Sequence, residues 1–133
     1  SFDAVLLDAP CSATGTLRRH PDLARHKMAG QVTELAALQA ALLSRAAALT
    51  APGGSLIYAV CSLEPLEGPG QVEVFLSLNP AFARQPIDGP LGALLGAEGL
   101  LTPEGDLRTL PCHWAGLGGM DGFYACRLRR LPG

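Results

Sequence analysis

Two cysteines in this chain follow apolar runs, and a cysteine thiol can act as a nucleophile. An apolar run covers residues 2–7 and is followed by Asp8, and Cys11 comes three residues after Asp8. A second apolar run, over residues 55–61, ends on Cys61. A thiol reacts at neutral pH when its pKa is lowered or a base lies nearby, because the thiolate is the reactive form. The two positions therefore predict a site for thiol chemistry.

Both apolar runs are predicted to be strands of an α/β sheet, and the first is expected to be buried on both faces. Pro10 lacks a backbone donor, and the residues from Ser12 to Gly15 favour a turn. Ligands of open α/β sheets bind at the carboxyl ends of the strands. We therefore expect Asp8, Cys11 and Cys61 at one edge of the sheet.

Helical patterns surround the second strand. The first predicted helix covers residues 31–49 and ends before Pro52, with a stripe of Leu35, Leu38, Leu42, Ala46 and Leu49. The second covers residues 69–78, with Gly68 as N-cap and a stripe of Val72, Phe75 and Leu76. Residues 81–106 have no steady period and are predicted to be loop with short strand or helix pieces. Strands are predicted over residues 107–112 and 123–130, joined by a glycine-rich loop.

This order of elements predicts an α/β fold with parallel strands and an antiparallel last pair. The chain has 133 residues, of which 48% are hydrophobic, enough for one domain with a real core. It begins almost inside a predicted buried strand, which indicates a piece of a larger domain.

Composition excludes several classes of protein. The net charge is −2, so a nucleic acid would have to bind a local patch rather than a general basic field. The longest apolar run is far below membrane-spanning length, and no signal-peptide pattern opens the chain. Four widely spaced cysteines in a well-cored chain favour reduced thiols and a cytoplasmic location.

Other roles for the cysteines are weighed against the nucleophile. A zinc site from Cys11, Cys61, Cys112 and His113 lacks any pair at metal spacing. Cys112 and Cys126 are interpreted as small buried hydrophobic residues. A cysteine hydrolase would need a histidine beside the thiol, and only His20 falls near the predicted edge, with no oxyanion-hole pattern.

Four motifs occur in an order that resembles a known family. They are residues 8–15 (Asp-Ala-Pro-Cys-Ser-Ala-Thr-Gly), residues 18–22 (Arg-Arg-His-Pro-Asp), residues 58–62 with Pro65 and Glu67, and residues 121–125 (Asp-Gly-Phe-Tyr-Ala). Together they resemble the RsmB/Sun family of S-adenosylmethionine-dependent RNA cytosine-5 methyltransferases, which act chiefly on ribosomal RNA. The motifs cover nearly the whole chain.

The resemblance implies a role for each candidate residue. Cys61 matches the nucleophile that adds to carbon 6 of cytosine, and Cys11 matches the cysteine associated with product release. Asp8 matches the acid of the pocket for cofactor and target base. The neighbouring basic residues, Arg18, Arg19 and His20, become candidate phosphate contacts.

The resemblance also implies that residues 1–133 are the C-terminal half of a Rossmann-like class I methyltransferase domain. The glycine-rich cofactor loop and the N-terminal RNA-binding region would then lie outside this chain. We expect the chain alone to be inactive and to self-associate through an open sheet edge. Val60, Leu66 and Gly68 depart from the family pattern of threonine, acid and asparagine, which keeps a non-catalytic RNA-binding relative as an alternative.

Overall fold

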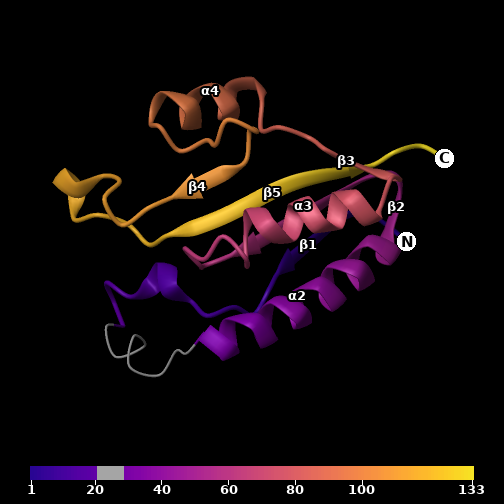
Figure 1. Ribbon diagram of the computed structural model, residues 1–133. Coiled ribbons are helices and arrows are strands. Elements are labelled where there is room, and N and C mark those ends of the chain that lie inside the picture. Colours follow the sequence, from indigo (N-terminus) through magenta and orange to yellow (C-terminus); the bar gives the residue numbers. More distant parts are fainter. Residues whose placement is uncertain (21–28) are drawn as a thin grey trace.

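The computed structural model describes residues 1–20 and 29–133, which form one mixed sheet with helices around it (Figure 1). The strands are β1 (Phe2–Asp8), β2 (Thr50–Val60), β3 (Phe82–Arg84), β4 (Leu107–Thr109) and β5 (Phe123–Arg130). The helices are α2 (Ala29–Leu49), α3 (Pro69–Leu78) and α4 (Gly89–Ala97), with the short 3₁₀ turns η1 (Thr14–Thr16) and η2 (Ala115–Leu117).

The sheet has the order β1-β2-β5-β3, and β4 also pairs with β5. β1 and β2 run parallel with Asp8 opposite Ala59, so their carboxyl ends are level. β5 runs antiparallel to β2, β3 and β4. The predicted α/β class, with parallel strands and an antiparallel last pair, is therefore confirmed.

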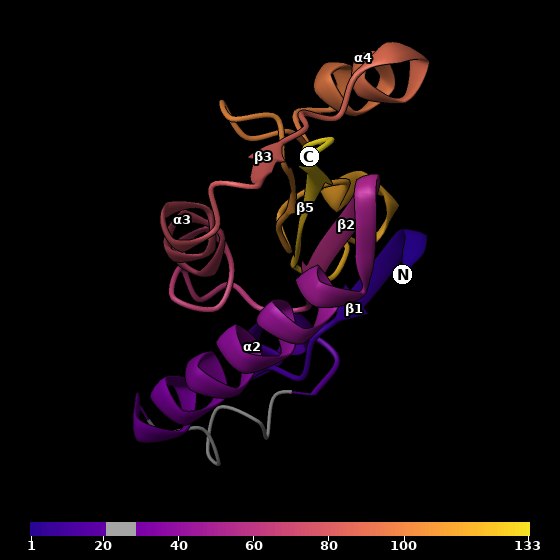
Figure 2. The same ribbon diagram turned by 90° about the vertical axis from the view of Figure 1, so that its right-hand side faces the viewer.

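Helices α2 and α3 pack on one face of the sheet (Figure 2). The core between them is built from fully buried side chains, which include Leu43, Leu56, Tyr58, Val60, Val72, Tyr124 and Leu128. The stripe predicted for the first helix is only partly right. Ala46 is buried and Leu35 and Leu42 are partly buried, but Leu38 and Leu49 are exposed. The buried residues of the helix are Ala36, Gln39, Leu43, Ala46 and Ala47. Alanine and leucine occur on every side of this helix, so apolar spacing alone does not identify its buried face.

The second face of β1 and β2 is exposed, so the prediction that β1 is buried on both faces is wrong. Phe2 is 58% exposed, Leu6 is 68% exposed and Ile57 is 36% exposed. Val5 and Leu7 point to the other face and pack against the core. β1 is an edge strand of the described sheet, and Figure 2 shows α2 and α3 on its opposite face. We call the surface formed by Phe2, Leu6 and Ile57 the open face.

Two further elements differ from expectation. The first helix ends at Leu49 as predicted, but β2 begins directly after it, at Thr50 rather than at Ser55. The pairing of β2 with β1 shifts register between Phe2 and Ala4. β4 ends at Thr109, and Pro111 lacks a donor for the ladder, so Cys112 is exposed rather than buried. The prediction of loop with short strand or helix pieces over residues 81–106 is confirmed, because this segment contains β3 and α4. Cys126 is fully buried, as predicted.

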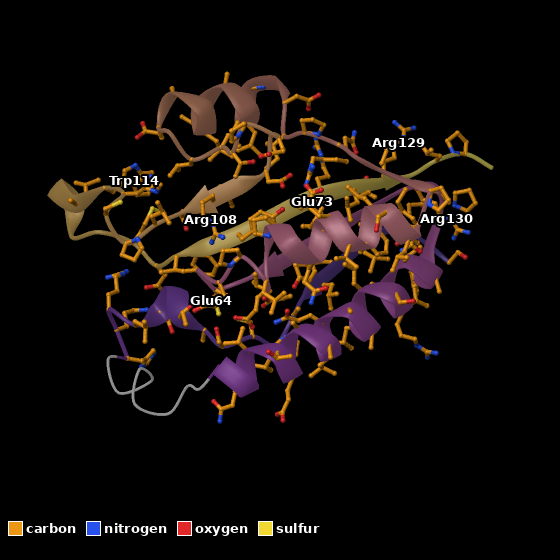
Figure 3. The ribbon with its side chains drawn as sticks, viewed as in Figure 1. Glu64, Glu73, Arg108, Trp114, Arg129 and Arg130 are labelled. Atoms are coloured by element: carbon orange, nitrogen blue, oxygen red, sulfur yellow. The ribbon has the colours of Figure 1, made fainter. Side chains whose placement is uncertain are left out.

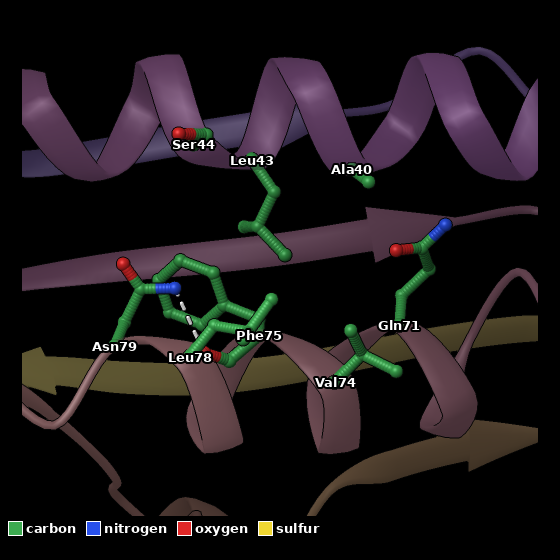
Figure 4. A pocket seen from close by; sticks show the side chains of 8 residues that line it. All are labelled: Ala40, Leu43, Ser44, Gln71, Val74, Phe75, Leu78 and Asn79. Carbon is green, nitrogen blue, oxygen red and sulfur yellow. Dashed lines mark hydrogen bonds between the residues drawn. The ribbon is translucent and has the colours of Figure 1, made fainter.

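A pocket lies between α2 and α3 (Figure 4). Leu43 and Phe75 line it, and none of its lining residues is ionisable. The amide of Asn79 donates a hydrogen bond to the Phe75 carbonyl at 2.8 Å, which closes one end of α3. The pocket is therefore a packing feature between helices rather than a site of thiol chemistry.

Residues 30–49 of α2 are long and apolar enough to cross a membrane by length and composition alone. This differs from the expectation based on uninterrupted apolar runs, because charged residues are few along the helix. Core helices of globular proteins pass the same test, and α2 packs against β1, β2 and α3. Its buried Gln39 takes part in the polar network described below.

Candidate active site

Cys11 and Cys61 lie side by side at the carboxyl ends of β1 and β2. Cys61 directly follows β2, and Cys11 lies in the loop after β1. Their sulfur atoms are 3.5 Å apart, and both side chains are partly exposed. We call the two loops, residues 9–16 and 61–67, the cysteine rim. The predicted meeting of the two thiols at one sheet edge is confirmed.

Backbone contacts hold the two loops of the cysteine rim together. The Gly15 amide donates to the Cys61 carbonyl at 3.1 Å, and the Leu63 amide donates to Thr14 Oγ1 at 2.9 Å. Gly122 donates to the Gly15 carbonyl at 2.7 Å, so the loop before β5 joins the same assembly. A Cβ atom on Gly15 would fall 1.9 Å from the Gly122 oxygen, so glycine is required at this close approach.

The Cys11 thiol is partly buried. Burial raises the pKa of this thiol to about 12, and the neighbouring Cys61 adds to the effect. Cys11 therefore remains protonated at neutral pH and can donate a hydrogen bond to Cys61 Sγ. A protonated thiol is not the reactive form, which disfavours Cys11 as a nucleophile.

Asp8 is the last residue of β1 and is exposed beside the rim. Within residues 1–20 and 29–133, nothing donates a hydrogen bond to its carboxylate. An exposed carboxylate at the carboxyl end of a strand is free to accept a hydrogen bond from a ligand. Its role as the acid of the pocket stays a prediction of the family resemblance.

The basic loop after η1 is partly neutralised by a carboxylate. Arg18 Nε lies 2.9 Å from Asp121 Oδ1, and Arg19 Nη2 lies 2.5 Å from Asp121 Oδ2. Hydrogen bonding from Arg19 lowers the pKa of the Asp121 carboxyl, so the carboxylate stays ionised. Both guanidinium groups remain solvent-accessible, with side chains 38% and 52% exposed. His20 is also exposed, whereas Pro21, Asp22 and His26 lie outside the described residues.

Sequence reasoning missed the side chains that support the rim. Arg108 Nη1 donates to the Ser62 carbonyl at 2.8 Å, and its guanidinium lies over the Tyr124 ring. Figure 3 shows Arg108 and Glu64 at the end of the sheet opposite Arg129 and Arg130. Glu67 is completely buried and accepts hydrogen bonds from Ser12, Ser62 and Gln39. Glu67 belonged to a recognised motif, but nothing in the sequence indicated its partners.

Metal ligation was a possible alternative for the cysteines. Among the residues that the structure describes, no group of three or more histidine, cysteine or acidic side chains is placed to hold a metal ion. Cys112 is exposed on the turn after β4, and His113 Nδ1 there accepts a hydrogen bond from the Leu110 amide at 2.9 Å.

Comparison with known proteins decides the family. The family model described as 16S rRNA methyltransferase RsmB/F matches residues 1–129. The chain belongs to this RsmB/F family. The resemblance seen in the motifs is confirmed. The family uses S-adenosylmethionine, so the predicted cofactor is confirmed as well.

Individual relatives agree with this assignment. Ribosomal RNA small subunit methyltransferase B from Thermus thermophilus is 42% identical over 127 residues, which are 96% of this chain and 29% of the relative. The solved structure of PH0851 has a TM-score of 0.80 at 33% identity and covers 96% of this chain and 26% of that one. NSun6 from Pyrococcus horikoshii, solved with the S-adenosylmethionine analogue SFG, has a TM-score of 0.73 at 23% identity, over 96% of this chain and 30% of that one.

These RsmB/F relatives are much longer than this chain, which spans 25% to 29% of the first curated relatives. A solved methyltransferase homologue from Pyrococcus horikoshii has a TM-score of 0.69 at 29% identity, over 98% of this chain and 40% of that one. The sheet is part of a Rossmann-like fold.

The departures from the RsmB/F motif leave the rim contacts in place. Leu66 is exposed, where the family usually has an acid. A Cβ atom on Gly68 would lie 3.1 Å from the Tyr124 ring, so an asparagine there would need the ring to shift. Val60 is buried in the core, and Glu67 keeps its hydrogen bonds.

Proposed function

We propose that this chain carries the catalytic cysteines of an enzyme that methylates carbon 5 of cytosine in RNA, with 16S ribosomal RNA as the substrate. The observation that carries the proposal is the 3.5 Å approach of Cys11 and Cys61 at the ends of two parallel strands. The free thiols and the proposed RNA substrate support a cytoplasmic location for the enzyme.

Cys61 acts as the nucleophile. Carbon 5 of cytosine is a poor nucleophile until the Cys61 thiolate adds to carbon 6, which makes the ring enamine-like. Carbon 5 would then take the methyl group from the sulfonium of a bound cofactor, whose methyl–sulfur bond would break and leave a neutral thioether. A base removes the carbon-5 proton, the C–H electron pair restores the ring double bond, and Cys61 leaves as the thiolate.

Cys11 assists product release in this account. Its thiol stays protonated because burial raises its pKa to about 12, so it does not compete as a nucleophile. At 3.5 Å it can donate a hydrogen bond to Cys61 Sγ as that sulfur regains its negative charge. Loss of Cys11 would then slow the elimination more than the addition.

Asp8 contributes to the pocket for S-adenosylmethionine or for the cytosine edge, because its exposed carboxylate is free to accept a hydrogen bond there. The cofactor supplies an electrophilic methyl group. The target base must leave its stack to reach the thiols, as flipped or single-stranded substrates do. Arg18, Arg19 and His20 would contact the RNA backbone beside the rim.

Replacement of the nucleophile tests this proposal. In the full-length protein, Cys61→Ala should lower methyl transfer by about a thousand-fold or more. It should also abolish covalent capture of RNA that contains 5-fluorocytosine. Cys112→Ala is the matched control, because Cys112 is an exposed cysteine away from the rim contacts described above. Wild-type turnover by Cys61→Ala would refute the assignment.

We also propose that the chain supplies only the cysteine-bearing part of the catalytic domain. The support is the free edge of β1 and the exposed Phe2 and Leu6 beside it. An unpaired apolar edge is a template for another strand. The 133-residue chain alone should therefore self-associate in light scattering and show no methyl transfer or calorimetric cofactor binding. A monodisperse monomer with micromolar cofactor affinity would refute this proposal.

A further inference from the structure

Glu67 lies in the turn between β2 and α3, and its side chain is completely buried. A buried carboxylate is costly unless it is paired or hydrogen-bonded. In the described part of the chain no cationic side chain forms an ion pair with it, and its partners are neutral donors. Such an arrangement needs every donor in place, so it fixes the groups that surround it.

The donors come from both loops of the cysteine rim. The Ser12 amide donates to Glu67 Oε2 at 2.9 Å, and the Ser12 hydroxyl donates to Oε1. The Ser62 hydroxyl donates to the same Oε1 at 2.7 Å. Ser12 directly follows Cys11, and Ser62 directly follows Cys61. One carboxylate therefore bonds to the residue after each thiol.

Glu67 is itself held from two further elements. Gln39 of α2 donates to Glu67 Oε2 at 2.8 Å and to the Pro10 carbonyl at 2.9 Å, just before Cys11. The Tyr58 hydroxyl of β2 donates to the Glu67 carbonyl at 2.5 Å. Burial alone would raise the pKa of the Glu67 carboxyl, but the hydrogen bonds from Ser12, Ser62 and Gln39 outweigh it and lower the pKa. The group is thus an ionised acceptor at neutral pH.

From these contacts we propose that Glu67 is a positioning residue that sets the separation of the Cys11 and Cys61 thiols. Its consequence for catalysis rests on the proposed covalent mechanism, because only there must both thiols reach one base. Other bonds between the loops, such as those from Gly15 to Cys61 and from Leu63 to Thr14, do not depend on Glu67. Loss of the carboxylate should therefore loosen the thiols while the loops stay joined.

Disulfide formation between the two thiols measures their separation directly. In the full-length protein, diamide is added and the peptide that links Cys11 to Cys61 is quantified by mass spectrometry over time. The oxidant takes two electrons and the two thiol protons, and its N=N bond becomes a hydrazine as the S–S bond forms. The rate needs neither RNA nor cofactor, so it is independent of methyl transfer.

Glu67→Ala should slow this disulfide about ten-fold or more, the effect of losing charge-assisted hydrogen bonds. The disulfide rate of Glu67→Gln should lie between those of Glu67→Ala and wild type. An amide can still accept a hydrogen bond from Gln39 and donate hydrogen bonds to the serine hydroxyls. Glu64→Ala is the matched control, since Glu64 lies in the same turn but is only partly buried. It should oxidise at the wild-type rate.

Ser12→Ala keeps the test decisive if Glu67→Ala does not fold. It removes one donor and leaves the amide, Ser62 and Gln39 bonds, so the disulfide should slow by about three-fold. Equal disulfide rates in wild type and in every folded variant, with only the melting temperature lowered, would overturn the proposal and leave Glu67 a purely structural residue.

Catalysis gives a second, separable readout. Glu67→Gln should lower kcat with little change in KM for RNA, because the substitution moves the thiols and not the RNA-facing surface. If the Glu67 variants slow the disulfide but wild-type enzyme forms no RNA adduct, the covalent function fails and the positioning role stands. If the disulfide rates are unchanged and the wild-type enzyme forms a normal RNA adduct, the positioning role fails and the covalent function stands.

Discussion

The cysteine rim and the open face belong to the same two strands but are built in opposite ways. At the rim, buried polar groups such as Glu67, Ser12 and Ser62 satisfy one another. On the open face, apolar side chains such as Phe2 and Leu6 meet solvent. The difference shows that the described residues satisfy the polar groups around the two thiols, whereas Phe2 and Leu6 on the open face stay largely exposed.

The same contrast separates what each region can tolerate. A polar network fails when one partner is lost, because the remaining buried groups are left unsatisfied. A solvent-exposed apolar side chain can be shortened at little cost. Substitutions on the rim should therefore be costly for activity, and substitutions on the open face should affect association more than folding.

The largest combined effect on stability and methyl transfer is expected where the rim loops touch. Gly15→Ala would place a Cβ atom 1.9 Å from the Gly122 oxygen and 3.0 Å from the Cys61 oxygen. Backbone must move to relieve this contact, so the free energy of unfolding should fall by about 3 kcal/mol. Urea denaturation and methyl-transfer assays would measure the loss. Gly116→Ala is the control, because a Cβ atom there meets nothing within 4 Å, and a loss as large as that of Gly15→Ala would contradict this account.

Two neighbouring residues of β2 sharpen the contrast between faces. Leu56 is fully buried against the helices, whereas Ile57 is 36% exposed on the open face. Leu56→Ala should cost about 2–5 kcal/mol of unfolding free energy, and Ile57→Ala about 1 kcal/mol. Denaturant titration of both variants measures the difference. Equal losses would mean that the open face is covered in the full-length protein.

A smaller effect is expected at the solvent side of the rim. Replacing both Arg18 and Arg19 by alanine should weaken RNA binding by about ten-fold at low salt and flatten its salt dependence, since fewer counterions are released. Asp121 already pairs with both arginines, so the change should be smaller than for two free cations. Filter binding over a salt series would measure it, with Arg45→Ala on α2 as a control. An unchanged affinity and salt dependence would mean that this loop is a solvated surface loop that does not contact RNA.

The sequence was sufficient to predict that Cys11 and Cys61 lie together, because each follows an apolar strand and the carboxyl ends of parallel strands lie at the same side of a sheet. It was not sufficient to predict the hydrogen bonds of Glu67, whose partners are up to 55 residues away in the chain and are brought together by the turn before α3. The buried face of α2 was missed for a related reason. Gln39 is polar, but it can be buried because its amide donates hydrogen bonds to the Glu67 carboxylate and the Pro10 carbonyl.

The prediction for β1 failed for a physical reason as well. Leu6 and Val5 look equally suited to burial in sequence, yet the helices that the structure describes pack only against the Val5 face of this strand. An apolar run indicates that both faces can be buried, and only the neighbouring elements decide whether they are.

The division of labour between the two thiols is tested most directly by Cys11→Ala in the full-length enzyme. The variant should still attack RNA through Cys61 but release it slowly, so a covalent protein–RNA complex should accumulate with unmodified cytosine as substrate. Denaturing electrophoresis and peptide mass spectrometry should find the RNA on Cys61, and Cys11→Ala combined with Cys61→Ala should show none. Free methylated product without an adduct, or an adduct on another residue, would contradict the account.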